Sequence, residues 1–270
     1  MVTFTLIRHA ESTDNVRAVW AGWKDATLTN HGMNQAKALG TALSSTQFTT
    51  IYASPLQRAL DTAKAIQAAQ TGSVPPLITS ILLREQHFGQ AEGKPYGRAR
   101  KPGLSLEEHF AQGIYPSPRN RAIAFPEGES LNDLAERVED AIDAVIVPEL
   151  DKGKDGNEDV HIAIVSHGLF LAELLNALLK RAKTAEMRDS WGMKNTGWTR
   201  LKVDILPNTD ANADAESSAP RLQVRVFAVN QHSHLDNLVK QRGIGSAGFD
   251  PKQRDIRGFF GGKSRIEKNR

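Results

Sequence analysis

The sequence contains no cysteine and no long apolar run, and these absences narrow the kind of protein it can encode. Without cysteine there is no disulfide and no thiolate zinc site, which fits a reducing compartment. No stretch approaches the roughly 18 consecutive apolar residues of a membrane helix, so we expect no membrane span. The first residues lack a basic segment followed by a long apolar one, so no signal peptide is expected. We therefore expect a cytoplasmic or nuclear protein.

An excess of positive charge is confined to one end of the chain. The net charge of the 270 residues is +3 at pH 7, but residues 242–270 hold eight Lys and Arg against three Asp and Glu. That segment contributes +5, so the rest of the chain is slightly acidic, at −2. A uniformly basic surface is not indicated, and we expect no nucleic-acid partner. Residues 243–270 are interpreted as a basic C-terminal tail. No oligomeric state follows from the sequence.

Three short apolar runs each end in polar residues and are followed by a helical pattern. The runs are Thr3–Ile7, Thr50–Ala53 and Val160–Val165. This alternation is typical of a mostly parallel sheet. We therefore predict an α/β fold over residues 1–242, a three-layer sandwich with helices flanking the sheet. A further strand is expected at Leu222–Val229.

Capping residues indicate where two of the helices begin. Ser54 is a suitable cap, and Pro55 a suitable first residue, for the helix after the second strand. Another helix is predicted from near Ser130, with Asp133 as its capping partner. Pro148 is expected to end that helix, because proline cannot continue the hydrogen-bond pattern.

Residues 90–126 interrupt the regular pattern. They contain several glycines and prolines and show little periodicity. Long connections of this kind often act as active-site lids. We predict a cap, inserted in the 1–242 domain, that covers its site.

Basic and imidazole side chains follow the predicted strands. Four of them stand at strand ends or helix starts: Arg8, His9, Arg58 and His167. Because the carboxyl ends of parallel strands meet at one edge of the sheet, we expect these side chains to lie together. Arginine forks match phosphate oxygens, a neutral imidazole can attack phosphorus, and a second imidazole can stabilise the transferring group. Glu85 is the candidate proton donor to the leaving alcohol.

Each of these residues alone also has an ordinary interpretation. A histidine at a strand end is usually a hydrogen-bonded structural residue, and a lone arginine or glutamate usually faces solvent. His232 and His234 could form a metal-binding pair, but no carboxylate stands at a fixed spacing from them. We therefore expect no metal and no other cofactor.

Several sequence blocks, taken in order, strengthen the functional interpretation. The main blocks are Leu6–Asn15, Tyr52–Ala63, Leu83–Gly93, Phe125–Ser130 and Val165–Gly168, and Ala21–Trp23 stands between the first two. Together they resemble the pattern of the histidine phosphatase (phosphoglycerate mutase-like) superfamily, over about residues 3–240. Asn195–Gly197 and Asn230–His232 are similar to its branch of fructose-2,6-bisphosphatases and related sugar phosphatases. The resemblance implies a phosphoglycerate mutase-like fold.

The resemblance also implies a role for each matching residue. His9 is then the nucleophile that becomes phosphorylated, and Glu85 is the acid/base. The implied phosphate and substrate contacts are Arg8, Arg58, His167, Ser12, Asn15, Gly22 and Gly168. The family usually has Gly after the nucleophile, and Ala10 here is familiar in its phosphatase branches.

These inferences lead to a predicted reaction and three alternatives. We predict metal-independent hydrolysis of phosphomonoesters through a phosphohistidine, and we expect the substrates to be small phosphorylated metabolites such as sugar phosphates. A phosphoglycerate mutase would use the same site, but Phe88 stands where glycolytic mutases have Tyr, and no two cap arginines are adjacent. A metal-dependent phosphatase would use His9, His167 and the His232–His234 pair as ligands. The third alternative is a non-catalytic protein that binds a phosphate ligand.

Overall fold

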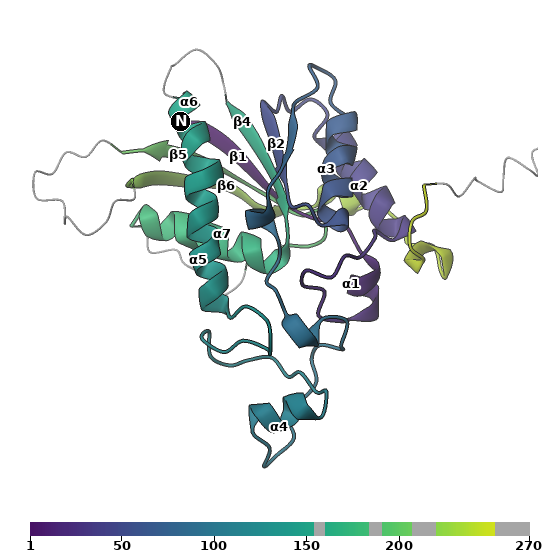
Figure 1. Ribbon diagram of the computed structural model, residues 1–270. Helices are drawn as coiled ribbons and strands as arrows, with labels where there is room; N and C mark the ends of the chain where they lie inside the picture. The colour runs from purple at the N-terminus through teal and green to yellow at the C-terminus, as the bar shows by residue number, and fades with distance from the viewer. Residues whose placement is uncertain (154–159, 184–190, 207–219, 252–270) are drawn as a thin grey trace, which may run out of the picture.

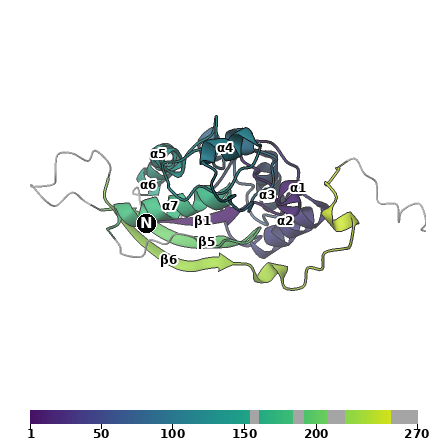
Figure 2. The ribbon, with the colours of Figure 1, turned by 90° about the horizontal axis from the view of Figure 1, so that it is seen from below.

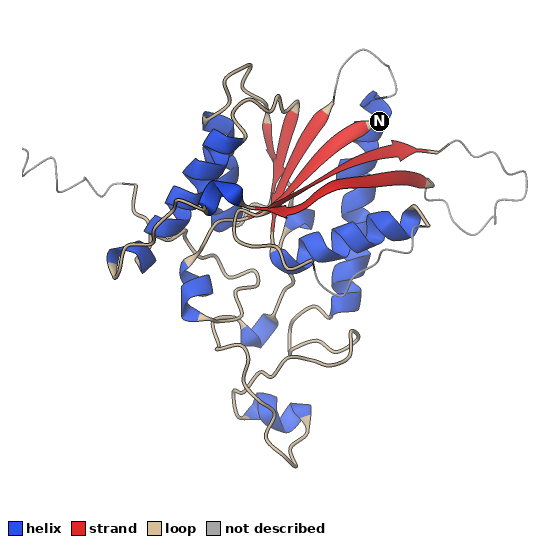
Figure 3. Cartoon of the chain, turned by 180° about the vertical axis from the view of Figure 1, so that it is seen from behind, coloured by secondary structure: helices blue, strands red, loops and turns tan. Residues whose placement is uncertain are grey.

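The computed structural model describes residues 1–153, 160–183, 191–206 and 220–251. Its centre is one six-stranded sheet in the order β3-β2-β4-β1-β5-β6 (Figure 3). The strands are β1 (Val2–Arg8), β2 (Thr50–Ala53), β3 (Leu77–Thr79), β4 (His161–Ser166), β5 (Trp198–Ile205) and β6 (Leu222–Gln231). The first four pair in parallel, and β5 and β6 join in antiparallel fashion. The predicted α/β fold and its predicted strands are confirmed, whereas β3 and β5 were not predicted.

Helices cover both faces of this sheet. They are α1 (Thr13–Arg17), α2 (Asn30–Ala42), α3 (Gln57–Ala68), α4 (Leu106–Ala111), α5 (Leu131–Ala141), α6 (Val147–Lys152) and α7 (Gly168–Arg181). In Figure 2, α5 and α6 lie on one side of β1, β5 and β6, and α2 and α3 lie apart from them. Side chains alternate along β1, so that Phe4 and Leu6 join the core under α5 and α7 while Ile7 joins the core under α2 and α3. None of the helices in the described part combines the length and apolar character needed to cross a bilayer.

The predicted cap of α3 is wrong. The residue that precedes the helix is Leu56, and no side chain caps it. Pro55 is therefore not the first helical residue. The fully buried Ser54 hydroxyl instead accepts the Leu56 N–H at 3.3 Å and lies 2.8 Å from Nε2 of His167. Ser54 lies two residues before the capping position, so its hydroxyl does not cap the helix and is available to the site.

The start predicted for α5 is confirmed and its end is wrong. Ser130 and Asp133 form a reciprocal capping box. The chain then passes through a π-helical turn, Ile142–Ile146, directly into α6, with Pro148 at the start of α6. Proline lacks an N–H and is tolerated in the first turn of a helix, where no partner is needed. The wider π turn lets α6 begin there.

The segment predicted as a cap projects from the sheet beyond the carboxyl ends of the strands (Figure 1). Its aromatic side chains pack with Trp20 and Phe88 from outside the segment, and the ring centroid of Trp20 lies 4.7 Å from that of Phe88 and 5.1 Å from that of Phe125. The buried His109 connects α4 to the segment before it, since its ring lies 2.6 Å from the Ser105 carbonyl oxygen and accepts the Lys101 N–H at 2.8 Å. That this segment covers the site in function stays a prediction.

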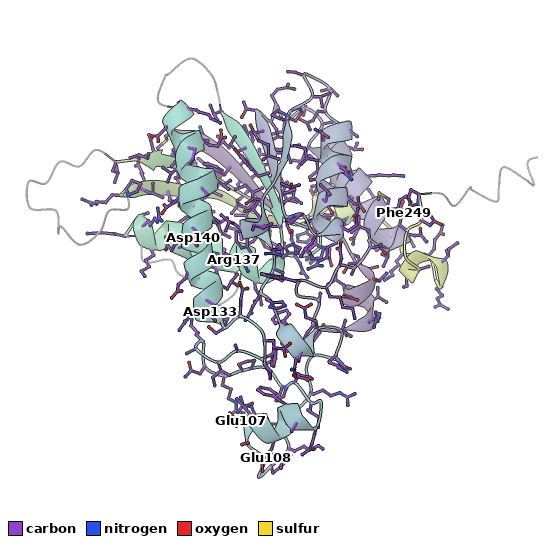
Figure 4. All side chains as sticks on the ribbon, in the orientation of Figure 1. Glu107, Glu108, Asp133, Arg137, Asp140 and Phe249 are labelled. Carbon is purple, nitrogen blue, oxygen red and sulfur yellow. The ribbon has the colours of Figure 1, made fainter. Side chains whose placement is uncertain are left out.

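The described start of the C-terminal tail packs on α2. The Asn30 N–H donates to the Ala247 carbonyl oxygen at 2.9 Å, and the Phe249 N–H donates to that of Leu28 at 2.8 Å. Just before the tail, Lys240 forms an ion pair with Glu11 at 2.8 Å. Phe249 is labelled in Figure 4. Residues 252–270 of the predicted tail lie outside the described residues.

Candidate active site

His9 is the first residue after β1 and is 4% exposed. Its N–H donates to the Ser166 carbonyl oxygen of β4 at 2.9 Å, which fixes it at the edge of the sheet. The ring Nδ1 lies 2.7 Å from the Ala10 carbonyl oxygen. Only a protonated nitrogen can donate to a carbonyl, so this contact selects the tautomer with the proton on Nδ1. Nε2 therefore carries the free lone pair.

The two site imidazoles are neutral. Burial lowers the pKa of His9 well below its usual value, and the charges of Arg58 and Arg8 lower it further against a weaker opposing effect of the Ala10 carbonyl. Burial likewise lowers the pKa of His167 well below its usual value, and Arg58, His9, Arg8 and Arg137 add to the effect. A neutral His9 at pH 7 keeps its lone pair for nucleophilic attack.

His167 stands beside His9 at the start of α7. The two ring centroids are 5.1 Å apart, with 56° between the ring planes. Because the Ser54 hydroxyl already accepts the Leu56 N–H, its own proton can point to Nε2 of His167. The ring then carries its proton on Nδ1, a buried atom that has no partner among the described residues. His167 can thus donate through Nδ1 to a ligand oxygen.

Arg8 and Arg58 are anchored by their outer nitrogens. Arg8 donates through Nη1 to the Met193 carbonyl oxygen at 2.7 Å. Arg58, which is 1% exposed, donates to the carbonyl oxygens of Gly22 and Lys24 at 2.7 and 3.3 Å. In both guanidinium groups Nε is buried, and within the described chain it has no hydrogen-bond partner.

Three buried donors are therefore left over in one place. A buried donor without a partner costs on the order of 1–3 kcal/mol, so native proteins rarely tolerate several together. Arg8 Nε, Arg58 Nε and His167 Nδ1 form such a set. All three side chains are close to His9, since the charges of Arg58 and Arg8 lower the pKa of His9 and His9 lowers the pKa of His167. This arrangement can hold an anion that accepts several hydrogen bonds, and a phosphate has the required oxygens.

Gly22 and Gly168 contribute backbone rather than side chains. Gly22 has a φ of +48°, and an added Cβ would collide with the Glu92 carboxylate. That carboxylate accepts the N–H groups of Trp23 and Lys24, both at 2.7 Å, and so fixes the loop that holds Arg58. A Cβ added at Gly168 would lie 3.6 Å from Arg8 Nε and 3.9 Å from Glu85 Oε2. Gly168 is therefore adjacent to both groups.

Asn15 is oriented by its neighbours. Its Oδ1 accepts from the N–H and hydroxyl of Ser12 at 3.0 and 3.1 Å and from the Asn195 amide at 3.2 Å. With the oxygen committed, the amide has its NH2 group to offer to a ligand. Asn195 also donates to the His9 carbonyl oxygen at 3.0 Å, which links Asn15 to the candidate nucleophile.

Glu85 lies at the N-terminus of α7. Its carboxylate accepts the N–H groups of Phe170 at 3.1 Å and Leu169 at 3.3 Å. Burial lowers the pKa of Arg8 and of Arg58, and Glu85 is close enough for its charge to oppose this effect. The structure therefore places all five predicted catalytic residues, including Glu85, around the same edge of the sheet.

Several residues that support this site were not predicted as part of it. The Glu85 carbonyl oxygen accepts from the Trp23 indole at 2.7 Å and from Arg137 at 3.0 Å, and Arg137 is paired with Glu129. Glu129 belongs to a sequence block that matched the family pattern. For Arg137 the sequence held only one indication, which is its position as a cation next to the apolar stripe of α5.

His232 and His234 have separate partners. The ring nitrogens of His232 lie 2.6 Å from the Asn230 carbonyl oxygen and 2.9 Å from Nζ of Lys194. His234 lies 2.9 Å from the Thr196 hydroxyl. Among the described residues, no group of three or more His, Cys, Asp or Glu side chains is arranged to hold a metal ion.

Comparison with known proteins identifies the family. Residues 4–205 match the pattern of the histidine phosphatase superfamily (branch 1). The chain belongs to this family. A probable phosphatase of Schizosaccharomyces pombe is 30% identical over 95% of this chain and 79% of its own length. A 2,3-bisphosphoglycerate-dependent phosphoglycerate mutase of Cytophaga hutchinsonii is also 30% identical, over 82% of this chain and 87% of its own.

Solved structures agree with this assignment. A mycobacterial glucosyl-3-phosphoglycerate phosphatase, solved with VO3, has a TM-score of 0.61 and 25% identity, and the match covers 85% of this chain and 99% of that chain. The protein is thus an enzyme of the histidine phosphatase superfamily, whose relatives include both phosphatases and mutases.

Proposed function

We propose that this histidine phosphatase superfamily member hydrolyses phosphomonoesters without a metal, through a phosphohistidine on His9. The observation that carries the proposal is a set of three buried donors, with no partner in the part of the chain that the structure describes, beside a neutral imidazole. Arg8, Arg58 and His167 can bind three phosphate oxygens, while Nε2 of His9 offers the lone pair. The donors are anchored before a ligand arrives, so they need little reorganisation during the reaction.

The first step forms a bond from Nε2 of His9 to phosphorus and breaks the bond from phosphorus to the leaving oxygen. Glu85, in its protonated form, transfers its proton to that oxygen, and the alcohol leaves. The ring keeps its Nδ1 proton, and the Ala10 carbonyl stabilises the positive charge that develops on the imidazole. The two guanidinium groups and His167 offset the charge on the transferring group.

The second step returns the enzyme to its initial state. Glu85, now a carboxylate, takes a proton from water as the water oxygen attacks phosphorus. The phosphorus–Nε2 bond breaks, and inorganic phosphate is released. Glu85 is protonated again, and His9 recovers its lone pair. Protons and bonds therefore balance over the cycle without a further reactant.

The proposed substrates are small phosphorylated metabolites, with sugar phosphates first. The S. pombe relative is named a probable phosphatase, and the solved mycobacterial protein is named for glucosyl-3-phosphoglycerate. The exposed cap can contact the part of the substrate that leaves. A panel of phosphorylated metabolites, with inorganic phosphate release as the readout, identifies the preferred members.

Rapid quenching during turnover tests the nucleophile. We expect an acid-labile, base-stable phosphoenzyme, and both trapping and turnover should disappear in His9→Ala. His232→Gln is the matched control, because it removes another imidazole at the same edge of the protein and should still be trapped. Substantial turnover by His9→Ala would overturn the assignment. Strong inhibition by chelators would instead favour a metal-dependent reaction.

A separate assay distinguishes hydrolysis from mutase activity. Both reactions start from the same phosphohistidine, but a mutase must exclude water and return the phosphate to a bound acceptor. With 3-phosphoglycerate and a trace of 2,3-bisphosphoglycerate, we expect inorganic phosphate and little 2-phosphoglycerate. Isomerisation faster than phosphate release from the best phosphoester would show that the enzyme is a mutase.

A further inference from the structure

Arg137 of α5 has every guanidinium nitrogen engaged. Nη1 donates to the carbonyl oxygens of Leu82 and Arg84, both at 2.8 Å, and Nη2 donates to that of Glu85 at 3.0 Å. Nε and Nη2 also donate to the two oxygens of Glu129, at 2.8 and 2.7 Å. Figure 4 shows Arg137 on α5 between Asp133 and Asp140. One side chain thus binds the backbone directly before and at the proposed acid/base.

Glu129 extends this contact beyond Glu85. Its Oε2 accepts the His87 N–H at 2.9 Å, and its own N–H donates to the His87 carbonyl oxygen at 2.7 Å. Burial alone would raise the pKa of Glu129, but hydrogen bonds from Arg137 and from the His87 N–H outweigh it and keep that pKa below its usual value. Glu129 is therefore a carboxylate, and with Arg137 it brackets Glu85 on both sides.

The bracketed segment has little structure of its own. It joins two short 3₁₀ turns, Ile81–Leu83 and Gly89–Ala91, and belongs to no helix or strand of the sheet. Its carbonyl oxygens therefore lack the regular partners that a ladder would supply. The side chains of Arg137 and Glu129 are only 12% and 18% exposed, and ion pairs so far from water add little net stability. Their burial is better explained by the position that they give to the Glu85 segment than by added stability.

We infer that Arg137, paired with Glu129, is a positioning residue that holds Glu85 where its carboxyl group meets the leaving oxygen. The inference rests on the acid/base role proposed above for Glu85. Arg137 touches no reacting atom, and its effect passes through the backbone at Leu82, Arg84 and Glu85. A lysine at this position keeps the charge but cannot form the same fork of bonds.

The test is a double-substitution cycle between Arg137→Lys and Glu85→Gln, read as the rate of the phosphorylation burst. In Arg137→Lys we expect the burst with an alkyl phosphate to slow by about 10- to 100-fold, because a displacement of about 1 Å is enough for such a loss. The burst with p-nitrophenyl phosphate should change by only a few-fold, since that leaving group needs little protonation. In the Glu85→Gln background, Arg137→Lys should have no further effect on the alkyl phosphate.

Arg181→Lys is the matched control. Arg181 is a similarly buried arginine that joins α7 to Glu139 and Asp143 and makes no contact with the Glu85 segment. It should lower thermal stability as Arg137→Lys does, but without dependence on the leaving group.

Each result has a distinct meaning. Equal losses on both substrates, or additive losses in the cycle, would overturn the positioning role of Arg137. If Glu85→Gln itself shows no leaving-group dependence, the proposed acid/base role fails instead. Unchanged burst rates in Arg137→Lys, together with a leaving-group effect in Glu85→Gln, would reject the inference and keep the proposed function.

Discussion

The proposed phosphate-binding edge of the sheet and the predicted cap beyond it are built in different ways. At the edge, His9, Arg58 and His167 are at most 4% exposed, and each is held by hydrogen bonds to backbone or to a buried hydroxyl. In the cap, residues 94–103 are all exposed, and the buried residues include His109 and a small cluster around Phe125. The edge can therefore hold reacting groups in a fixed geometry, whereas the cap offers an exposed surface that a substrate can contact.

This difference suggests a division of labour within one enzyme. Phosphoryl transfer needs charges that are oriented before the substrate arrives, and strand ends beneath two helical layers provide that rigidity. Selection among leaving groups needs contact area that can vary, and an exposed segment provides it. Changes at the edge should reduce chemistry, and changes in the cap should alter only preference.

After the complete loss expected in His9→Ala, the largest effect is expected at the edge, in Glu85→Gln. Turnover of alkyl phosphates should fall by roughly 10²–10⁴-fold, the usual contribution of general acid–base catalysis. The loss should be smaller for p-nitrophenyl phosphate. Steady-state kinetics on substrates with leaving groups of graded pKa measure this dependence. Equal losses across the series would remove Glu85 from the proton-donor role.

A cap substitution, Tyr96→Ala, should have a selective effect. Tyr96 is 53% exposed, its ring centroid is 6.0 Å from that of Trp20, and it lies near enough to Arg8 to interact with its charge. Loss of one such contact should change kcat/KM for sugar phosphates by about tenfold. Acetyl phosphate, which has only a small group to contact the cap, should be hydrolysed at nearly the same rate. Tyr96→Phe separates the hydroxyl from the ring, and a similar loss on acetyl phosphate would abolish the proposed division.

Stability should fall in acid because of the neutral histidines. The pKa values of His9 and His167 are lowered well below the usual value, and that of His161, in β4, is lowered by burial, Arg200 and Lys202 to about 4. Below about pH 6.5 these histidines bind protons in the unfolded chain but not in the folded chain, so the free energy of unfolding decreases as the pH falls. Each histidine can contribute up to about 1.4 kcal/mol per pH unit in this range.

Urea unfolding at pH 7.5 and pH 5.5 measures this loss. His161→Gln removes one histidine away from the proposed active site and should make the pH dependence shallower. A stability that does not change between the two pH values would show that these imidazoles accept protons in the folded state.

The smallest effect is expected from removal of the tail. Truncation after Arg242 deletes the contacts of Ala247 and Phe249 with the start of α2, but it retains the Lys240–Glu11 ion pair near the site. Hydrolysis of small substrates should stay within a few-fold, with a lower melting temperature. A chain truncated after residue 251 keeps all of these contacts and serves as the control. If activity collapses in the shorter chain only, residues 243–251 are part of the catalytic unit.

Some of the structure was readable because it depends on local patterns. Apolar runs followed by polar residues located β1, β2 and β4, and their parallel order brought Arg8, His9 and His167 to one edge. β5 carries the alternation that is typical of a strand, since Thr199, Leu201 and Val203 are buried at every second position. β3 is three residues long and mostly exposed, so it gave no comparable signal.

Ser54 and Pro148 show where local rules fail. Ser54 followed by proline is an ordinary start for a helix, but its hydroxyl contacts a histidine 113 residues later in the chain. Pro148 is an ordinary end for a helix, but a π-helical turn before it lets α6 continue the same direction. For Ser54, the contact with a distant residue outweighed a capping preference worth about 1 kcal/mol. For Pro148, the π-helical turn places the proline in the first turn of α6, where its missing N–H needs no partner.

The sequence by itself determined the order of β1, β2, β4 and β6, the family pattern and the residue types available for phosphate chemistry. It did so because strand and helix periodicities and chain connectivity act over a few residues. Only the tertiary structure decided which donors have no partner among the described residues and which side chain holds Glu85. Those properties depend on Met193, Glu129 and Arg137, which reach the site through packing, and their positions are set by long-range contacts that no local pattern encodes.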